Sequence, residues 1–269
     1  MCVPRLKGRF DFRLGTSSYI IPADIEPNVR ALAPFVDDIE LVLFESDEFS
    51  NLPDERTIPR LANIAEDHDL TYTVHFPLDT QLGARDEVER RASVEKCLRV
   101  YRLTRSLSPH AWIVHFHGER RGSDPAADIE GWLDALRRSV GDLLEGGIPP
   151  GLTAVETLDY PFDVVWPIVS ENELSVCIDV GHLIVNGYDP VATTLKYREA
   201  CRVVHLHGVR NGKDHLDLGG MDRSLLRKLI RLFETPEVPE RVVTLELFSR
   251  SDFECSMNVL GGLNSEDGR

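Results

Sequence analysis

The sequence predicts a single α/β domain of the (β/α)8 TIM-barrel class. Short apolar segments alternate eight times with amphipathic ones along 269 residues, a usual length for one such barrel. Six of the apolar segments end in a side chain that can bind a metal ion, namely His75, His117, Glu156, Asp179, His205 and Glu246. Because a (β/α)8 barrel gathers the carboxyl ends of its strands around one mouth, we expect these six side chains to meet there.

The first half of the chain supplies four predicted strands and four predicted helices. Runs of four to six aliphatic and β-branched residues are typical of buried parallel strands, and they occupy 12–15, 39–44, 71–75 and 111–116. The intervening segments predict helices over about 28–35, 54–68, 84–107 and 125–144. Asp54 is a plausible N-cap of the second helix, and Ser123 or Asp124 of the fourth. The stripe of the third helix that should face the barrel comprises Val88, Ala92, Val94, Leu98, Tyr101 and Leu103.

The second half repeats the pattern. Strands are predicted to end at Glu156, Asp179, His205 and Glu246. Helices are predicted to begin near Pro161, to cover 190–201 after Asp189 and 222–233, and to close with a short segment capped by Ser251. We expect the barrel to fill 1–262 and a flexible tail to follow over 263–269. The glycine-rich dinucleotide fingerprint is missing after the first strand, which disfavours an open Rossmann sheet.

Composition narrows the class of protein and its partners. Five scattered cysteines without a CxxC pair (Cys2, Cys97, Cys177, Cys201 and Cys255) indicate reduced thiols and a cytoplasmic location. Neither a signal peptide nor an apolar stretch of about 18 residues is evident, so no membrane partner is expected. The net charge of −15, from 45 acidic and 30 basic residues, argues against nucleic acid as a partner.

The predicted strand ends carry the residue types that bind metal ions in proteins. A single His after an apolar run is usually a hydrogen-bonded core residue, and a single carboxylate is usually a cap. In a barrel, however, Glu156, Asp179 and Glu246 would crowd three negative charges together, which a cation or large pKa shifts must relieve. Added imidazoles complete the ligand set of Zn²⁺ or Mn²⁺. We therefore expect one to three divalent metal ions per chain.

Further histidines lie close to these ligands along the chain. His115 and His117 are two residues apart, as are His205 and His207, so each pair faces one side of its strand. One member of each pair could bind metal while the other binds substrate or carries a proton, and the sequence leaves that choice open. His182, beyond the sixth strand, and His215 could hold an outer metal, with Asp214 an additional candidate. His68 and His110 precede their strands and are expected to be structural.

Taken together, these motifs resemble the endonuclease IV and xylose isomerase-like superfamily. The matching motifs are His75-Phe-Pro, His117-Gly, Glu156-Thr, Asp179-x-Gly-His182, His205-Leu-His and Leu-Glu246. The resemblance implies a central metal held by Glu156, Asp179, His205 and Glu246. It also implies a second metal at His75 and His117, bridged by Glu156, and a third at His182 and His215. The third site departs from the family pattern, because Lys213 stands where the family has Asp.

The extra histidines favour one of the reactions found in this superfamily. Its sugar isomerases and epimerases need one metal, whereas clustered metals suit phosphodiester hydrolysis. The acidic charge and the lack of basic, aromatic insertions disfavour a DNA-repair enzyme. Segments 13–24 and 36–45 resemble the cobamide-remodelling phosphodiesterases, which cut the nucleotide loop of a cobamide into cobinamide and a ribazole phosphate. That resemblance implies the same hydrolysis here, and the predicted catalytic residues are Glu156, Glu246, His207 and His115.

Several other residues are candidates for binding the substrate. Tyr19, in the first loop at the catalytic mouth, would offer an apolar wall to a corrinoid, or it would simply pack within the loop. Arg120, Arg121 and Arg210 lie in mouth loops and could contact a phosphate, although solvated surface arginines are the commoner case. Two alternative functions stay open: a one-metal sugar or inositol isomerase or epimerase, and a non-catalytic barrel that binds a corrinoid or a metal. The oligomeric state is left open as well.

Overall fold

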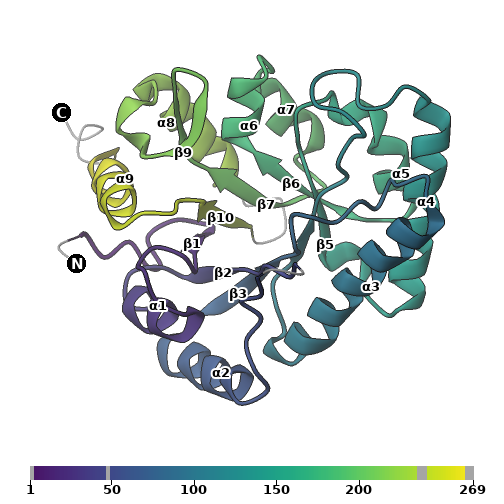
Figure 1. Cartoon of the computed structure of the whole chain (residues 1–269). Coiled ribbons are helices and arrows are strands. Elements are labelled where there is room, and N and C mark those ends of the chain that lie inside the picture. Colours follow the sequence, from purple (N-terminus) through teal and green to yellow (C-terminus); the bar gives the residue numbers. More distant parts are fainter. Residues whose placement is uncertain (1–2, 47–48, 235–240, 264–269) are drawn as a thin grey trace.

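Eight parallel strands close into a barrel at the centre of the protein (Figure 1). The computed structural model describes residues 3–46, 49–234 and 241–263. Around the barrel the strands follow the order β1-β10-β7-β6-β5-β4-β3-β2. Their bounds are β1 Arg13–Ser17, β2 Asp38–Val42, β3 Thr71–His75, β4 Trp112–Val114, β5 Thr153–Glu156, β6 Ser175–Asp179, β7 Cys201–Leu206 and β10 Val242–Leu245. The predicted fold class is therefore confirmed.

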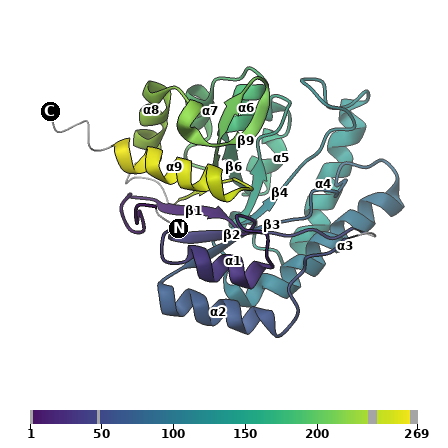
Figure 2. The same ribbon diagram turned by 60° about the vertical axis from the view of Figure 1, so that its left-hand side comes forward.

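Helices surround the barrel and cover the outer faces of its strands (Figures 1 and 2). The α-helices are α1 Ile25–Leu32, α2 Thr57–His68, α3 Glu87–Thr104, α4 Ile129–Glu145, α5 Trp166–Glu171, α6 Val180–Val185, α7 Pro190–Tyr197, α8 Arg223–Phe233 and α9 Arg250–Leu263. Short 3-10 turns are η1 Arg105–Leu107, η2 Pro150–Leu152, η3 Phe162–Val164 and η4 Leu218–Gly220. Asp189 and Asp222 cap α7 and α8 through their side chains, and α7 begins directly after Asp189 as predicted.

Three predicted helix starts were wrong, two of them because a different side chain caps the helix. Asp128 accepts the N–H of Gly131 and starts α4, so neither Ser123 nor Asp124 is its cap. The N–H of Asp252 bonds to Ser249, two residues before the predicted cap of α9. Pro161 precedes the 3-10 turn η3 instead of opening an α-helix. Each error amounts to a few residues, the usual uncertainty of helix ends.

The buried stripe of α3 also differs from the prediction. Val94, Leu98 and Tyr101 are buried as expected, whereas Val88 is 78% exposed and Ala92 is exposed. The buried residues of α3 are Arg90, Ser93, Val94, Cys97, Leu98, Val100, Tyr101 and Thr104. Arg90 enters this face because its guanidinium pairs with Glu87 and Asp142 at 2.8 and 2.7 Å. The helix therefore packs partly through paired polar groups, which a purely apolar stripe cannot reveal.

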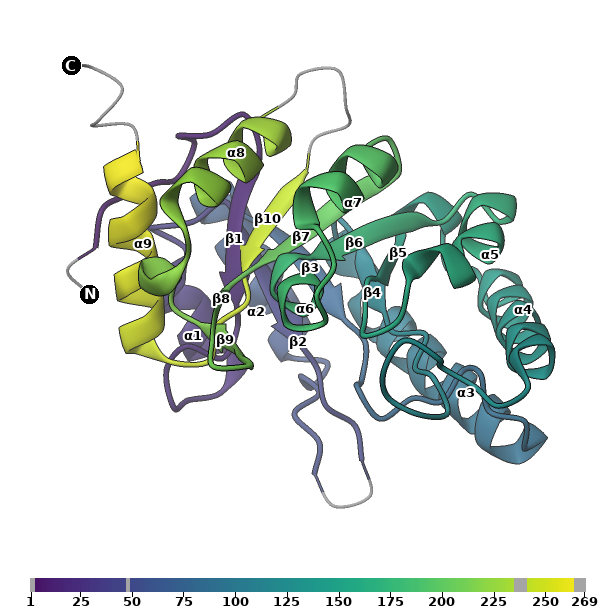
Figure 3. The same ribbon diagram turned by 90° about the horizontal axis from the view of Figure 1, so that it is seen from above.

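Two elements at the carboxyl end of the barrel were absent from the prediction. Helix α6 follows directly on β6, and a two-stranded antiparallel hairpin, β8 Gly208–Arg210 and β9 Lys213–Leu216, follows β7. The predicted helix over 190–201 ends earlier, at Tyr197, because its last residues turn into β7. Viewed from above, the hairpin and α6 lie beside one another, next to the ends of β6 and β7 (Figure 3).

The interior of the barrel contains both an apolar cluster and polar side chains. Residues in or beside β4 to β7 contribute the small apolar cluster, consisting of Ala111, Ile113, Ala154, Cys177 and Val203. Glu40 of β2 reaches across the barrel to His205 of β7, so both side chains point inward. Residues paired in register share a face, which places Thr73 beside Glu40 and Thr244 beside His205. Asp38 shares the inner face of β2 with Glu40.

The chain ends and the cysteines bear on the remaining predictions. Cys97, Cys177, Cys201 and Cys255 are free thiols, and Cys2 lies outside the described residues. Of the predicted tail, only Leu263 is described, as the last residue of α9, and 264–269 lie outside the described residues. In the part of the chain that the structure describes, every helix is too short or too polar to span a bilayer.

Candidate metal centre

One buried carboxylate lies at the centre of the barrel mouth. Glu156, the last residue of β5, is 1% exposed. Its Oε2 lies 2.8 Å from Nε2 of His115, 3.3 Å from Nε2 of His75 and 3.4 Å from Nδ1 of His205. Its Oε1 lies 3.2 Å from Nδ1 of His182. Burial alone would raise the pKa of Glu156, but His115, His205 and His182 outweigh it and hold that pKa well below the usual range.

His205 faces a set of carboxylates. Its Nδ1 lies 3.2 Å from Oε2 of Glu246, 3.4 Å from Glu156 and 3.6 Å from Oδ2 of Asp179. Neither this nitrogen nor Oε2 of Glu246 has a hydrogen-bond partner within the described residues, although both are buried. Burial lowers the pKa of His205, yet Cys177 and the surrounding carboxylates, Glu246 among them, raise it well above 6.5. A cation at this point would satisfy the orphaned atoms.

The donor set at this point fits a divalent metal. Three carboxylates and one imidazole, from β5, β6, β7 and the position directly after β10, converge on the same place, namely Glu156, Asp179, His205 and Glu246. Burial tends to raise the pKa of Glu246, but His205 lowers it to about 2, so the carboxylate is charged and able to bind metal. Mixed oxygen and nitrogen donors suit Zn²⁺ or Mn²⁺.

His205 of β7 and His207, directly after β7, differ in what their rings can do. Nδ1 of His207 accepts the backbone N–H of His215 at 2.9 Å, so its proton sits on Nε2. That Nε2 donates to Asp179 at 3.1 Å. His207 is thus suited to orienting a carboxylate, whereas His205 faces the carboxylate set with its Nδ1.

The geometry also distinguishes His75, at the end of β3, from His115 and His117, which follow β4. Nδ1 of His75 donates to the carbonyl of Phe76 at 2.7 Å, which leaves Nε2 free to face Glu156. His115 contacts Glu156 directly. His117 lies further out, where its Nε2 is 2.9 Å from the carbonyl of Leu78 and 3.2 Å from Nδ1 of His115. The structure therefore brings His75 and His115 to Glu156, and His117 only through His115.

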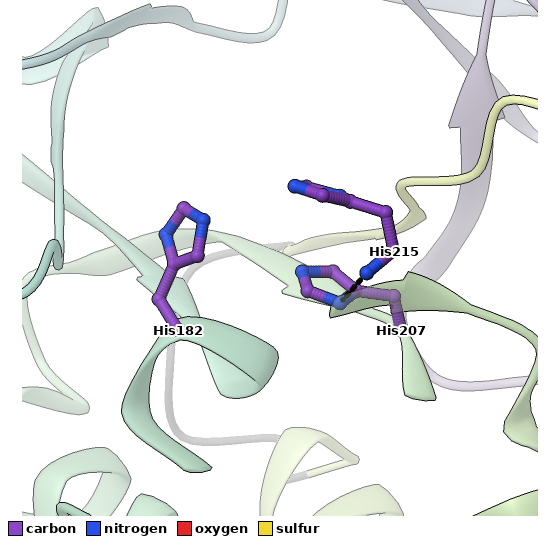
Figure 4. A group of neighbouring side chains, drawn as sticks. All are labelled: His182, His207 and His215. Atoms are coloured by element: carbon purple, nitrogen blue, oxygen red, sulfur yellow. Dashed lines mark hydrogen bonds between the residues drawn. The ribbon is translucent and has the colours of Figure 1, made fainter. Parts of the chain in front are cut away.

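A second group of imidazoles lies at the outer edge of the mouth (Figure 4). The ring of His215 stacks on that of His207 with centroids 4.2 Å apart, and His182 faces both across a shared space. His182 comes from α6 and His215 from the hairpin. Asp214 approaches His182 only to 3.9 Å. Burial lowers the pKa of His182, but Asp179 and Glu156 together raise it to about 10.

A glycine allows α6 to lie close to β7. A Cβ added at Gly181 would come within 2.0 Å of Cε1 and 2.3 Å of Nδ1 of His207. The Asp179-x-Gly-His182 motif therefore has a steric reason, because Asp179 also accepts the N–H of His182 at 2.6 Å and starts α6. The motif places two side chains of the site within one turn.

The predicted substrate-binding residues lie at the rim of the mouth or on the surface. Tyr19 is 41% exposed, and its ring packs edge-on against Phe44. Tyr19 lines a groove of about 1000 Å³ between the loop after β1 and the loop after β2. Arg120 pairs with Asp124 at 2.9 Å, Arg210 pairs with Asp217 at 2.7 Å, and Arg121 is exposed. These three arginines thus lie on the surface in this structure, two of them neutralised by neighbouring carboxylates.

Two buried residues at the site were missed in the sequence. Glu40 is fully buried and lies 2.9 Å from Nε2 of His205. Cys177 lies close enough to Glu156 and His205 to share an ion with them. Glu40 could have been noticed, since a carboxylate inside the apolar run 39–44 needs a buried partner. Cys177 offered no such signal, because a cysteine side chain is common in a buried apolar strand.

Comparison with known proteins places these residues in a wider context. A family model described as xylose isomerase-like TIM barrel matches residues 36–260. A D-tagatose 3-epimerase-like protein is similar in structure, with a TM-score of 0.73, 20% identity, and coverage of 94% of this chain and 97% of that one. Endonuclease IV from Thermus thermophilus gives a TM-score of 0.67 and 20% identity over 94% of this chain and 99% of that one. No curated protein sequence matches the chain. At these identities the structural likeness establishes the fold.

Proposed function

The chain belongs to the xylose isomerase-like TIM barrel family, and we propose that it is a metal-dependent phosphodiesterase that cuts the nucleotide loop of cobamides. The proposed products are cobinamide and a ribazole phosphate. The family contains epimerases, isomerases and an endonuclease, so the reaction must be argued from the site.

The observation that carries the proposal is the number of imidazoles around Glu156. Four histidines contact its two oxygens, namely His75, His115, His182 and His205. A centre for one metal needs only the set formed by Glu156, Asp179, His205 and Glu246. The additional imidazoles contact both oxygens of Glu156, His75 and His115 at Oε2 and His182 at Oε1, which suits a carboxylate shared by more than one ion. Clustered metals are typical of phosphodiester hydrolysis.

The residues fall into three groups that would each hold an ion. Glu156, Asp179, His205 and Glu246 would hold the central one. His75 and Glu156 would hold a second, with His115 or His117 completing it. His182 and His215 would hold the third. Asp214 would supply the carboxylate of this site, because Lys213 stands where the family has Asp. Bound divalent ions would supply an acidified water and positive charge to offset the phosphate oxygens.

The chain's own groups would position the substrate and manage protons. His207 holds Asp179 in place through its Nε2 proton. His115 donates to Glu156 from Nε2 and accepts from His117 at Nδ1, so a proton could pass outward along this pair. Glu246 is 6% exposed at the edge of the mouth, which lets it contact a leaving group or a water. Burial around Glu156 keeps bulk water from separating these groups.

The substrate is proposed to extend from the metal centre into the neighbouring groove. That groove opens at the same end of the barrel as the strand ends, and its walls carry exposed aromatic side chains, Tyr19 and Phe49. A large, partly apolar molecule would suit it better than a small sugar. The net charge of −15 opposes a nucleic acid substrate. A reducing compartment such as the cytoplasm suits the free thiols.

Metal counting is the first test. Protein purified without chelator should contain two or three equivalents of Zn²⁺ or Mn²⁺, measured by elemental analysis. A value that never exceeds one equivalent, even after reconstitution, would favour a one-metal isomerase or epimerase. Protein that binds no divalent ion would contradict the metal centre altogether.

Substrate hydrolysis is the second test. Metal-loaded protein should convert a cobamide into cobinamide, followed by liquid chromatography. Glu246→Gln should lower the rate by at least about 100-fold, because it removes one charge from the carboxylate set. Glu66→Gln, on the exposed side of α2, is the matched control and should keep full activity. Hydrolysis of a generic aryl phosphodiester without cobamide turnover would keep the reaction class and reject the substrate. Binding of the cobamide without any turnover would favour a non-catalytic barrel.

A further inference from the structure

We propose that Glu40 is a positioning residue, which fixes the tautomer and orientation of His205 so that Nδ1 faces the metal. This inference depends on the proposed metal centre but not on the proposed substrate. Glu40 belongs to β2, which lies between β1 and β3 in the barrel. No metal ligand was predicted from this strand. Its contact with His205 crosses the barrel from β2 to β7.

The geometry of the imidazole ring assigns the two nitrogens different partners. Oε2 of Glu40 lies 2.9 Å from Nε2 of His205. A carboxylate accepts, so Nε2 carries a proton, and Nδ1 is the nitrogen that would supply a lone pair to an ion. Nδ1 lies 3.2 to 3.6 Å from oxygens of Glu246, Glu156 and Asp179. Glu40 thus occupies one nitrogen of the ring and leaves the other for an ion.

Burial makes this contact important for Glu40 itself. Both Glu40 and His205 are 0% exposed. A buried carboxylate is costly without a partner, and Oε1 of Glu40 has none within the described residues. The hydrogen bond from His205 is therefore the principal compensation that Glu40 receives. A bond that both partners need will hold the ring in one orientation, which is how outer carboxylates tune metal-binding histidines.

Glu40 could instead be a ligand, since Glu40, His205 and Glu246 lie close enough to share an ion. The contact argues otherwise. Glu40 meets Nε2, whereas the carboxylates from β5, β6 and β10 meet Nδ1 of the same ring. The two nitrogens of an imidazole point in different directions, so an ion at Nδ1 lies away from Glu40. The structure therefore favours a carboxylate–histidine–metal arrangement.

The test compares Glu40→Gln with Asp38→Asn. Asp38 is an equally buried carboxylate two residues earlier on the same inner face, and its Oδ2 accepts from Thr71, away from His205. We measure the affinity of the metal-free proteins for Zn²⁺ by competition with a chelator. Glu40→Gln should weaken binding by about 10- to 100-fold, and Asp38→Asn by less than about threefold. Equal affinities of the wild type and Glu40→Gln would overturn the proposal.

Nuclear magnetic resonance of the wild type gives an answer even if Glu40→Gln fails to fold. Protein labelled with 15N in its histidines and loaded with Zn²⁺ should show His205 protonated at Nε2 and bound to the ion through Nδ1. The His205 signals are assigned from the spectrum of His205→Gln. An Nε2 of His205 that carries no proton in the loaded protein would make Glu40 a ligand, which contradicts a positioning role.

The two proposals fail in different ways. If wild-type protein binds no Zn²⁺, the metal centre itself is rejected. If the wild type binds Zn²⁺ tightly and Glu40→Gln binds it equally well, only the role of Glu40 is rejected. Loss of activity alone would not separate these cases, so the affinity and the protonation state are the deciding measurements.

Discussion

The backbone N–H of His215 donates to Nδ1 of His207 over 2.9 Å, and this bond fixes the tautomer of His207. The donor belongs to the hairpin and the acceptor directly follows β7, so the hairpin fixes a ring at the end of a barrel strand. With Nδ1 occupied, Nε2 must carry the proton and donate to Asp179. His207 thereby orients a carboxylate of the central set, and His205 is left as the histidine of this strand that can bind the metal.

Replacing the two histidines separately should reveal this division. His205→Ala removes a proposed ligand and should abolish tight metal binding. His207→Ala removes no ligand of the central ion, but it removes the proton that orients Asp179 and the contacts with His215, so Zn²⁺ affinity should fall by about 10- to 100-fold. His207→Gln is the matched variant, because its side-chain amide can still donate to Asp179, and it should recover part of the loss. Equal effects of His205→Ala and His207→Ala on the measured affinity would contradict the assignment.

Gly181→Ala should damage the site although glycine binds nothing. The new Cβ would lie 2.0 Å from the His207 ring, so the ring or α6 must move. We expect Zn²⁺ affinity to fall by about tenfold or more through misplacement of Asp179 and His182. Gly141→Ala, a glycine of α4 with nothing within 4 Å of an added Cβ, is the control and should bind metal normally. Normal affinity in Gly181→Ala would show that the contact relaxes without cost.

Metal removal should lower the stability of the fold. Without an ion, His205 and three carboxylates share a buried space in which Oε2 of Glu246 lacks a partner among the described residues. An ion that binds only the folded state at 100 times its dissociation constant adds about 2.7 kcal/mol. The midpoint of thermal unfolding should therefore fall by roughly 5–10 °C after chelation and return when Zn²⁺ is restored. An unchanged midpoint in protein shown to be metal-free would argue that the cluster is purely structural.

The buried carboxyl of Asp38 should make stability depend on pH. Burial raises its pKa to about 6 from 3.8, while the hydrogen bond from Thr71 limits the rise. The folded state therefore holds this proton more tightly than the unfolded state. Its contribution to stability is largest below about 3.8 and is lost as pH rises through about 6, by roughly 3 kcal/mol.

Urea unfolding of the wild type and of Asp38→Asn between pH 4 and 7.5 isolates this effect. The free energy of unfolding of the wild type, relative to the variant, should fall by roughly 2.4 kcal/mol across that range, because part of the full effect lies below pH 4. Other carboxyl groups titrate in both proteins and cancel in the difference. A difference that stays flat would place the pKa of Asp38 near its ordinary value.

The strands were predictable from the sequence because they are buried on both faces and therefore apolar throughout. Glu156 and Asp179 end β5 and β6 where expected, and their convergence follows from barrel closure alone. Helix starts were less predictable, because several acidic or hydroxyl side chains near each start could cap it. Asp128, and not Asp124, fits the turn before α4.

The fine assignment of the histidines could not be predicted. In the sequence His115 and His117 are equivalent, since both face the barrel interior. What separates them is depth: His115 reaches Glu156, while His117 meets the carbonyl of Leu78 in a loop after β3. The partner of His205 was hidden for a similar reason. Glu40 lies 165 residues away, and only the closed barrel brings the two together.

The outer histidines come from different elements than the inner ones, namely the helix α6 and the hairpin β8–β9. The central set lies on or next to the barrel strands, whose register ties each residue to its neighbours. His182 and His215 come from short elements appended after those strands. An insertion or deletion in such an element would add or remove the outer imidazoles without disturbing barrel closure. Divergence within one scaffold could thus change how many ions a member holds, and with it the reaction, through changes confined to two surface connections.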